Sequence, residues 1–326
     1  MRHAQRVFSR DVGQRNEKIL DLRPFPEQAP RPGSDPLGLL FRRSMLWRAE
    51  RQARSAWIEH VPFAFWLVDV LRPQKIVELG TYSGVSYSAM CQAVKSLGLA
   101  TSCFAVDTWR GDEHAGFYPE DIYHEFAAFH DRHYVAFSRL VRASFDEALP
   151  HFDDGTIDLL HIDGFHTYEV VKHDYETWLP KLSPNAIVLF HDTNVREGDF
   201  AVHRLWNEIA CDRLHFEFMH GHGLGVLTTG VDYPEPLKIL FAAEGNQALT
   251  AEIRSMFSYL GRSTRDSTEL ALQELGARDA VAHIGALRST ARILSGLRRR
   301  ILGRMKSAVD CLLKRHPGVR PGLDRE

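Results

Sequence analysis

The sequence is poor in cysteine and has none of the cysteine spacings that zinc sites use. Its four cysteines, Cys91, Cys103, Cys211 and Cys311, lie far apart, and no two of them form a C-x-x-C pair. Neither a zinc site nor a disulfide framework is therefore predicted. Cys91 and Cys103 stand in apolar stretches, which is typical of buried thiols. A reducing compartment fits this composition, so we predict a cytoplasmic protein.

The sequence also lacks a hydrophobic run long enough to cross a membrane. The longest apolar stretch, VPFAFWLVDVL at residues 61–71, includes Pro62 and Asp69 and is too short to span a bilayer. At the N-terminus, MRHAQRVFSRDVGQR has basic residues with no apolar segment after them, so a signal peptide is not predicted.

The chain has no large excess of charge of either sign. The formal net charge of −2 favours neither a nucleic acid nor an acidic substrate as partner. This balance hides an asymmetry, because the segment from Arg288 to Glu326 contains eleven Lys or Arg residues against three acids. The tail therefore carries about +8 and the rest of the chain about −10.

The length of 326 residues and the 44% hydrophobic content allow a full-size core. We predict an irregular, proline-rich arm at residues 1–44, a central domain at 45–232 and a helical extension at 233–326. In the central domain, strand and helix patterns alternate, which indicates a parallel sheet with helices on both faces. The expected strands are residues 75–79, 102–107, 139–144, 157–163, 186–192, 214–219 and 223–230, the last two pairing antiparallel.

Polar residues follow the ends of the first five expected strands. They are Glu78, Asp107, Ser144, Asp163 and the pair His191 and Asp192. Any one of them alone is easily explained as a helix cap or an exposed turn residue. Because ligands bind outside the carboxyl ends of such strands, five together indicate a binding site.

The loop after the first expected strand reads VELGTYSGVSYS, residues 77–88. Gly80 allows a sharp turn and Gly84 opens the next helix, but the spacing is not the G-x-G-x-x-G fingerprint of dinucleotide sites. Asp107, at the end of the next strand, is placed to accept hydrogen bonds from both ribose hydroxyls of an adenosine. Glu78 would repel a pyrophosphate but suits a positively charged amine. This combination favours S-adenosylmethionine over NAD.

Five segments together resemble a known family. VELGTYSGVSYS, AVDTWRGDEHAGFY, LVRASFDEAL, IDLLHIDGFHTYEVVKHDYETWLPKL and VLFHDT follow the order seen in class I S-adenosylmethionine-dependent methyltransferases. They look most like the branch with macrolide sugar O-methyltransferases and cephalosporin hydroxylase-like proteins. The resemblance covers about residues 60–230, and it implies a Rossmann-like, doubly wound, seven-stranded sheet, mostly parallel with an antiparallel last strand. Tyr82 departs from the wider superfamily, which often has glycine there.

The resemblance implies roles for the cofactor-binding residues. The methionine end of S-adenosylmethionine would be held by Glu78, Gly80, Tyr82, Ser83 and Gly84. Asp107 would bind the ribose, with Thr108 and Trp109 beside it, and Ser144 and Phe145 would border the adenine. For Trp109 and Phe145 the alternative is ordinary core packing.

Asp163 and Asp192 are expected side by side, because the fourth and fifth strands are neighbours in this fold. Two such carboxylates repel each other unless a positive charge lies between them, which predicts a divalent cation such as Mg²⁺. His191 stands where the relatives often have an acid, and imidazole suits Mn²⁺ or other transition metals better than Mg²⁺. His166 matches a catalytic base in part of the family; the alternative is a helix-capping histidine.

Two features are left with open alternatives. His220 and His222, in HGHGLGV, are interpreted as solvated residues of a tight hairpin rather than as a metal site. From Leu287 to Leu312, apolar residues spaced three or four apart predict a basic amphipathic helix. Such a helix can bind an anionic inner-membrane surface, or pack on its own domain or a partner subunit of a homo-oligomer. The modest apolar side chains favour packing.

The sequence thus predicts an S-adenosylmethionine-dependent O-methyltransferase, metal-assisted, that acts on a hydroxyl of a sugar or of a polysaccharide or glycoconjugate precursor. The alternative is a non-catalytic scaffold that keeps the cofactor-binding fold within a glycan-assembly complex. The presence of Asp163, His166 and Asp192 together favours the enzyme.

Overall fold

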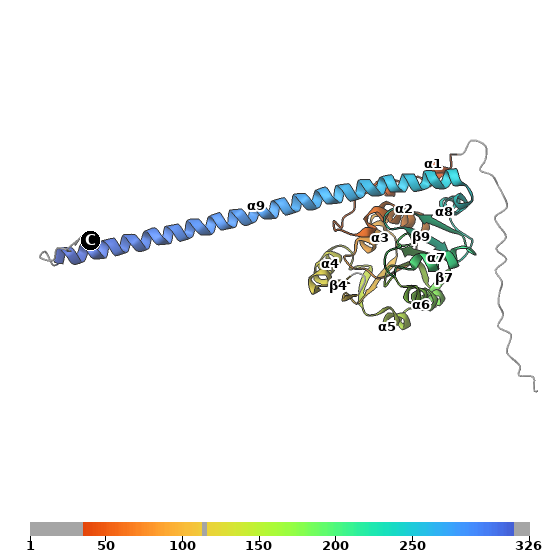
Figure 1. The fold of residues 1–326 in the computed structure, drawn as a ribbon, viewed down its shortest axis with the longest axis horizontal. Coiled ribbons are helices and arrows are strands. Elements are labelled where there is room, and N and C mark those ends of the chain that lie inside the picture. The colour runs from red at the N-terminus through yellow and green to blue at the C-terminus, as the bar shows by residue number, and fades with distance from the viewer. Residues whose placement is uncertain (1–34, 113–115, 316–326) are drawn as a thin grey trace, which may run out of the picture.

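A seven-stranded sheet forms the centre of the molecule, as the computed structural model shows for residues 35–112 and 116–315 (Figure 1). The strand order is β5-β2-β1-β6-β7-β9-β8, and only β9 runs antiparallel to its neighbours. The strands are β1 (Lys75–Leu79), β2 (Ser102–Asp107), β5 (Ser138–Arg142), β6 (Ile157–Ile162), β7 (Leu182–His191), β8 (His215–Phe218) and β9 (Leu224–Thr228). The predicted Rossmann-like sheet with an antiparallel last strand is confirmed.

Helices cover both faces of the sheet and bury two separate hydrophobic clusters. The helices on one face are α2 (Val61–Leu71), α3 (Val85–Leu97) and α4 (Glu120–His133), and on the other α5 (Phe145–Ala148), α6 (Tyr168–Trp178) and α7 (Val202–Ala210). Successive residues of β1 point to opposite faces of the sheet. Ile76 packs in the cluster under α2, α3 and α4, and Val77 packs in the cluster under α5, α6 and α7. A strand covered on both faces has to be apolar throughout, and this explains the nearly continuous apolar run of β6, IDLLHI.

The short connections differ from the prediction in detail. Turns of 3₁₀-helix, η3 (Leu149–His151) and η4 (Leu179–Lys181), extend α5 and α6, each with a proline at its start. Helix α6 ends at Trp178, and after η4 the strand β7 begins at Leu182 instead of the expected 186. A two-stranded hairpin of β3 (Gly111–Asp112) and β4 (Gly116–Phe117) was not predicted.

The N-terminal part of the described chain is more ordered than an irregular arm. It contains α1 (Pro36–Leu40), η1 (Arg43–Leu46) and η2 (Ala56–His60). Leu40 is fully buried, and its carbonyl accepts a hydrogen bond of 2.6 Å from Trp66 Nε1 in α2. Residues 36–44 of the predicted arm are therefore anchored to the domain; residues 1–34 lie outside the described part.

The C-terminal extension begins as part of the domain and continues as one long helix (Figure 1). Helix α8 (Glu235–Ala242), η5 (Ala243–Gly245) and the first turns of α9 (Gln247–Arg315) pack on the sheet domain, burying Ile253 and Phe257. The predicted helix from Leu287 to Leu312 is the distal part of α9. Most side chains there lie outside the description, so membrane contact and subunit packing both stay predictions.

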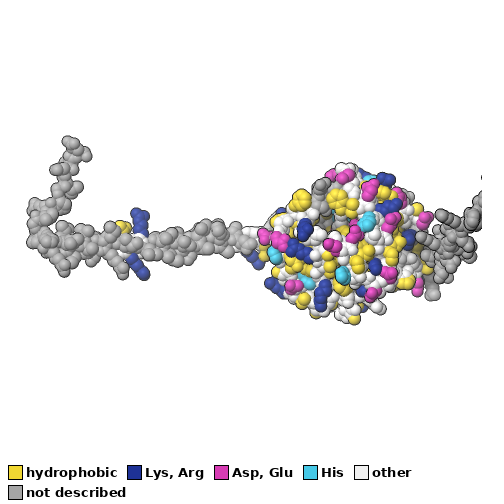
Figure 2. Space-filling model, turned by 90° about the horizontal axis from the view of Figure 1, so that it is seen from below, with side chains coloured by type: hydrophobic (Ala, Val, Ile, Leu, Met, Phe, Trp, Pro, Cys, Tyr) yellow, Lys and Arg dark blue, Asp and Glu magenta, His cyan; other side chains and the backbone are white. Residues whose placement is uncertain are grey.

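The mixed charges on the surface and the buried cysteines in the core agree with what the composition predicted. Figure 2 shows basic, acidic and apolar side chains interspersed over the visible face of the domain. Cys91 and Cys103 are buried free thiols, as predicted. In the described part of the chain, no helix is both long and apolar enough to cross a membrane.

Candidate active site

A pocket of about 230 Å³ opens at the carboxyl ends of β1, β2 and β6. Its lining includes eight of the residues predicted from sequence: Gly80, Tyr82, Asp107, Thr108, Ser144, Phe145, Asp163 and His166. Thr81, Gly111, Tyr118, Gly164 and Phe165 complete it and were not predicted. Thr81 and Gly164 directly follow the predicted site residues Gly80 and Asp163, so their place in the lining could have been predicted from the sequence. Tyr118 directly follows the hairpin strand β4 and was not singled out from the sequence.

Two glycines bring the backbone close on the inner side of this pocket. Gly80 has φ +87°, and a Cβ at this position would lie only 2.0 Å from the carbonyl oxygen of Asp163. A Cβ on Gly164 would lie 2.5 Å from the ring of Phe145. A side chain at either position would displace its neighbours, so these glycines keep the pocket open where a cofactor would lie.

The carboxylate of Asp107 ties the glycine loop to the end of β2. Its Oδ2 accepts hydrogen bonds from the backbone amides of Thr81 and Tyr82, at 2.8 and 2.9 Å, and its Oδ1 accepts one from Trp109 at 2.6 Å. Asp107 is half-buried and lines the pocket, so the same carboxylate shapes the loop and faces the ligand position.

Trp109 takes the packing role that the sequence left open. It is buried, contacts the ring of Tyr123 at 5.1 Å and donates from Nε1 to the carbonyl of Tyr82 at 2.9 Å. Trp109 does not line the pocket. Ser144 and Phe145 do; Ser144 also caps α5, forming reciprocal hydrogen bonds with Glu147.

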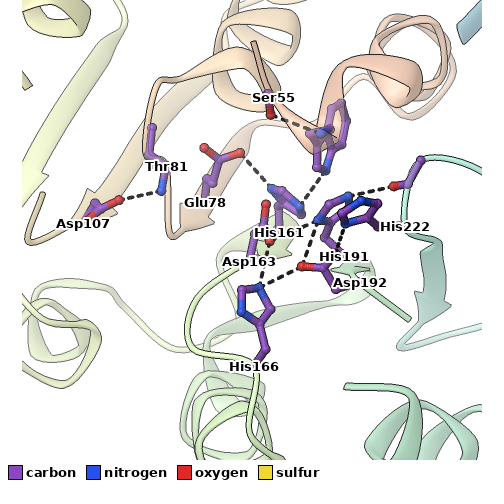
Figure 3. A network of polar contacts seen from close by, with 12 residues as sticks. Ser55, Glu78, Thr81, Asp107, His161, Asp163, His166, His191, Asp192 and His222 are labelled. Atoms are coloured by element: carbon purple, nitrogen blue, oxygen red, sulfur yellow. Dashed lines mark hydrogen bonds and ion pairs between the residues drawn. The ribbon is translucent and has the colours of Figure 1, made fainter. Parts of the chain in front are cut away.

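Three further residues predicted to hold the methionine end lie behind the pocket. Glu78 is fully buried and forms a hydrogen bond of 2.8 Å with Nδ1 of His161, its neighbour on β6. Nε2 of His161 accepts from Trp57 Nε1 at 3.1 Å, so the Nδ1 proton goes to Glu78. Burial raises the pKa of Glu78, although the bond from His161 opposes this. The buried Glu78 carboxylate thus faces His161 (Figure 3), and Glu78 does not line the pocket.

Ser83 and Gly84 have structural partners as well. The carbonyl of Ser83 accepts a hydrogen bond from Arg51 Nε at 3.1 Å. Gly84 is the N-cap of α3 with φ +76°, and a Cβ there would lie 2.0 Å from the Phe126 ring. The second glycine of the loop is therefore required by packing against α4.

Asp163, His191 and Asp192 come together at the ends of β6 and β7, as predicted (Figure 3). One donor atom from each lies within 4.8 Å of the others. Nδ1 of His191 is 3.3 Å from Asp163 Oδ1 and 3.4 Å from Asp192 Oδ2. Two carboxylate oxygens and one imidazole nitrogen at these separations form a donor set suited to a divalent metal ion.

His166 lies on the open side of the same cluster. Its Nε2 is 2.9 Å from Asp192 Oδ2 and 3.6 Å from Asp163 Oδ1. The ring stacks on Phe200 with centroids 4.6 Å apart and an angle of 10°. Thr167 holds the N-cap position of α6, so His166 is not the helix cap that the sequence left as the alternative.

The charges of the cluster shift the pKa values of its members. Burial alone lowers the pKa of His166, but Asp163 and Asp192 outweigh it and raise this pKa to about 9. The same competition raises the pKa of His191 to about 10. Burial raises the pKa of Asp192, but hydrogen bonds from His166 and His191 outweigh it and lower this pKa. The two imidazoles supply the positive charge between the carboxylates, in the place where a cation would fit.

Backbone conformations also mark this region. Among the described residues, five that are not glycine have a left-handed φ. Tyr82 lines the pocket, Trp109 follows the lining residue Thr108, and Asp192 and His222 lie at the cluster. Such conformations are costly for residues with a side chain and are retained where they serve a site. The fifth, Arg72, ends helix α2.

Comparison with known proteins agrees with this location. Residues 77–193 match the model of a methyltransferase-domain family, and this range spans Asp107, Asp163 and Asp192. The chain is also 56% identical over 183 residues to the uncharacterized protein y4gI of Sinorhizobium fredii. The aligned segment is 56% of this chain and 20% of that protein. The chain thus spans about a fifth of the length of this curated relative.

Several solved structures resemble the chain at low identity. The O-methyltransferase TomG from Streptomyces achromogenes, in complex with SAM and involved in tomaymycin synthesis, is 14% identical with a TM-score of 0.41, over 61% of this chain and 91% of that chain. The SAH-bound methyltransferase PaMTH1 of Podospora anserina is 13% identical with a TM-score of 0.41, over 52% and 76%.

Proposed function

We propose that this chain, whose residues 77–193 match a methyltransferase-domain family, transfers a methyl group from S-adenosylmethionine to a hydroxyl group, assisted by a divalent cation. The observation that carries the proposal is the continuity of the pocket with the acidic cluster. Asp163 and His166 belong to both. A methyl donor in the pocket and a hydroxyl at the cluster would therefore meet at these two side chains.

The pocket residues fit the parts of S-adenosylmethionine. Asp107 offers carboxylate oxygens to the ribose hydroxyls, and Phe145 offers a flat apolar surface to the adenine. Gly80 leaves room beside the loop for the methionine end. No pyrophosphate is needed to explain any of these residues.

The cluster fits a divalent cation held by Asp163, His191 and Asp192. The sequence favours Mg²⁺ with Mn²⁺ as the alternative, and the imidazole of His191 shifts the balance toward Mn²⁺, because Mg²⁺ prefers oxygen ligands. When bound, S-adenosylmethionine supplies an electrophilic methyl group and the cation supplies Lewis-acid polarisation of the acceptor hydroxyl.

We assign to His166 the role of the general base that accepts the proton of the acceptor hydroxyl. Methyl transfer to the hydroxyl oxygen would form the oxygen–carbon bond, break the bond between the methyl carbon and sulfur, and release one proton. A cation bound to Asp163 and Asp192 would neutralise the charges that raise the pKa of His166, and the neutral imidazole would then accept this proton at Nε2. The stack on Phe200 and the hydrogen bond of 2.8 Å from the Ala201 amide to the His166 carbonyl hold the imidazole over the cluster. Asp192, whose Oδ2 lies 2.9 Å from this nitrogen, would accept a hydrogen bond from the imidazolium that forms.

We further propose that the acceptor is a sugar, or a polysaccharide or glycoconjugate precursor, in the cytoplasm. This class is supported by the resemblance of HIDGFHTYE and VLFHDT to the sugar-modifying branch. A non-catalytic scaffold is the alternative, and the complete set of Asp163, His166 and Asp192 speaks against it.

The test is methyl transfer from methyl-labelled S-adenosylmethionine to a panel of nucleotide sugars and oligosaccharides, with and without EDTA. Asp163→Asn and Asp192→Asn should each abolish the dependence on divalent metal. His166→Ala should keep cofactor binding and lose roughly 10²–10⁴-fold in turnover, the usual contribution of a general base. Full activity in EDTA would remove the cation from the mechanism. Cofactor binding by calorimetry with no transfer to any acceptor would support the scaffold.

A further inference from the structure

The turn between β8 and β9, residues 220–223 with the sequence HGHG, has contacts that the proposed function does not use. The sequence suggests a hairpin with solvated histidines, and His222 is indeed exposed. The turn nevertheless also lies against the acidic cluster, and Figure 3 shows His222 beside His191 and Asp192. Two of the three candidate metal ligands receive a hydrogen-bond partner from it.

The first contact fixes the orientation of His191. The carbonyl of Gly221 accepts a hydrogen bond from Nε2 of His191 at 3.1 Å, and a second from Nε2 of His60 at 3.0 Å. A carbonyl only accepts, so Nε2 of His191 must carry a hydrogen. In the neutral ring the lone pair is then on Nδ1, the atom that faces Asp163 and Asp192. The turn thereby selects the nitrogen that can bind a metal ion.

The second contact fixes the carboxylate of Asp192. Nδ1 of His222 lies 3.1 Å from Oδ1 of Asp192, and an ionised carboxylate can only accept, so His222 donates. Oδ2 is left facing His191 and His166. The imidazole of His222 also lies nearly parallel to that of His191, with centroids 6.2 Å apart and an angle of 11°.

The turn is held in a strained form that keeps these contacts. His222 has φ +69° and Asp192 has φ +61°, although neither is glycine. The Asn194 amide donates to the carbonyl of His222 at 2.9 Å, and a Cβ on Gly223 would lie 2.6 Å from Asn194 N. Such strain persists where the surroundings over-determine it, usually at a functional site.

We propose that the HGHG turn is the outer shell of the metal centre: Gly221 sets the ligating nitrogen of His191, and His222 sets the carboxylate of Asp192. The inference rests on the metal-assisted function proposed above. Outer-shell partners of this kind orient first-shell ligands and tune the metal. Because the turn leaves Nδ1 of His191 as the nitrogen that faces the ion, and a bound ion would displace the proton from this atom, the centre takes a first-row transition ion such as Mn²⁺ or Co²⁺ in preference to Mg²⁺.

Metal binding to the full chain, freed of metal and without S-adenosylmethionine, tests this directly. Co²⁺ is titrated by its visible absorption, and Mn²⁺ and Mg²⁺ by calorimetry. His222→Ala should weaken Co²⁺ and Mn²⁺ binding 10- to 100-fold, the usual effect of losing an outer-shell partner. His222→Asn, which keeps a donor, should recover most of the loss. His220→Asn is the matched control, since His220 packs on His60 and Phe218.

The outcomes separate the inference from the function on which it rests. Equal Co²⁺ affinity in wild type and His222→Ala, with Asp192→Asn weakened, overturns the outer-shell role and leaves the metal centre standing. No Co²⁺ or Mn²⁺ binding by the wild type overturns both. Mg²⁺ binding as tight as Mn²⁺ binding overturns the ion preference. An unchanged melting temperature in His222→Ala together with weakened metal binding supports the inference, because a merely structural turn residue would not give that result.

Discussion

Asp174 should make the stability of this protein fall as the pH rises. This residue of α6 is only 4% exposed, and a Cβ on Gly164 would lie 3.6 Å from its Oδ2, so the carboxyl sits behind the pocket. Among the described residues, Oδ2 has no hydrogen-bond partner. Burial raises the pKa of Asp174 to about 7, with Asp146 adding to the effect and His173 opposing it. His173, the preceding residue of α6, pairs with Asp146 and not with Asp174.

The size and sign of the effect follow from proton linkage. The usual pKa of an aspartate is 3.8, so between this value and about 7 the folded state binds more protons at Asp174 than the unfolded state. Stability therefore falls as the pH rises through this window, by about 4 kcal/mol in all. About 2.5 kcal/mol of that loss falls between pH 5 and pH 8.

Urea denaturation of wild type and Asp174→Asn at pH 5, 6, 7 and 8 measures this effect. The amide cannot ionise, so the stability of the variant relative to wild type should increase by about 2.5 kcal/mol from pH 5 to pH 8. Asp153→Asn removes an exposed carboxylate and serves as the matched control, with a difference that stays constant. A constant difference for Asp174→Asn as well would refute the reasoning and show that this carboxyl is ionised at its usual pH.

Two further predictions concern the loop and the core behind it. Asp107→Ala should weaken S-adenosylmethionine binding by about 1.5 to 3 kcal/mol, the range of hydrogen bonds to charged groups; calorimetry that shows unchanged affinity would remove the ribose assignment. Trp57→Phe leaves the buried Nε2 of His161 without a donor and should lower the free energy of unfolding by about 1 to 3 kcal/mol. Its cofactor affinity should stay that of wild type, and a loss there would place the network of Trp57, His161 and Glu78 in contact with the ligand.

The sheet was predictable because its signals are local. Each strand of the parallel part is a short apolar run, and each is followed by a polar residue and a helical pattern, so the order of elements follows from the chain. The meeting of Asp163 with His191 and Asp192 follows from the same logic, because neighbouring parallel strands end at one edge.

Long-range side-chain contacts were beyond the sequence. Glu78 lies at the end of the first strand, in a position that suits a cofactor amine. In the structure it instead forms a buried hydrogen bond with His161 on β6, 83 positions later, and His161 in turn accepts a hydrogen bond from Trp57 of η2. His222 looked like a hairpin residue because nothing local connects it to Asp192, which lies 30 positions earlier. Contacts of this kind depend on strand pairing and turn geometry together. The local pattern of apolar and polar residues in the sequence does not predict them.

Asp163 explains why pocket and cluster cannot be treated as independent parts. Its amide donates to the carbonyl of Leu79 at 2.8 Å, and its carbonyl fills the space where a side chain on Gly80 would be. Its carboxylate faces His191 and His166. A shift of the glycine loop on cofactor binding would therefore move the carboxylate at the cluster through one residue of backbone. For a transfer reaction this linkage is useful, because the groups that hold the donor and those that prepare the acceptor share a rigid strand end.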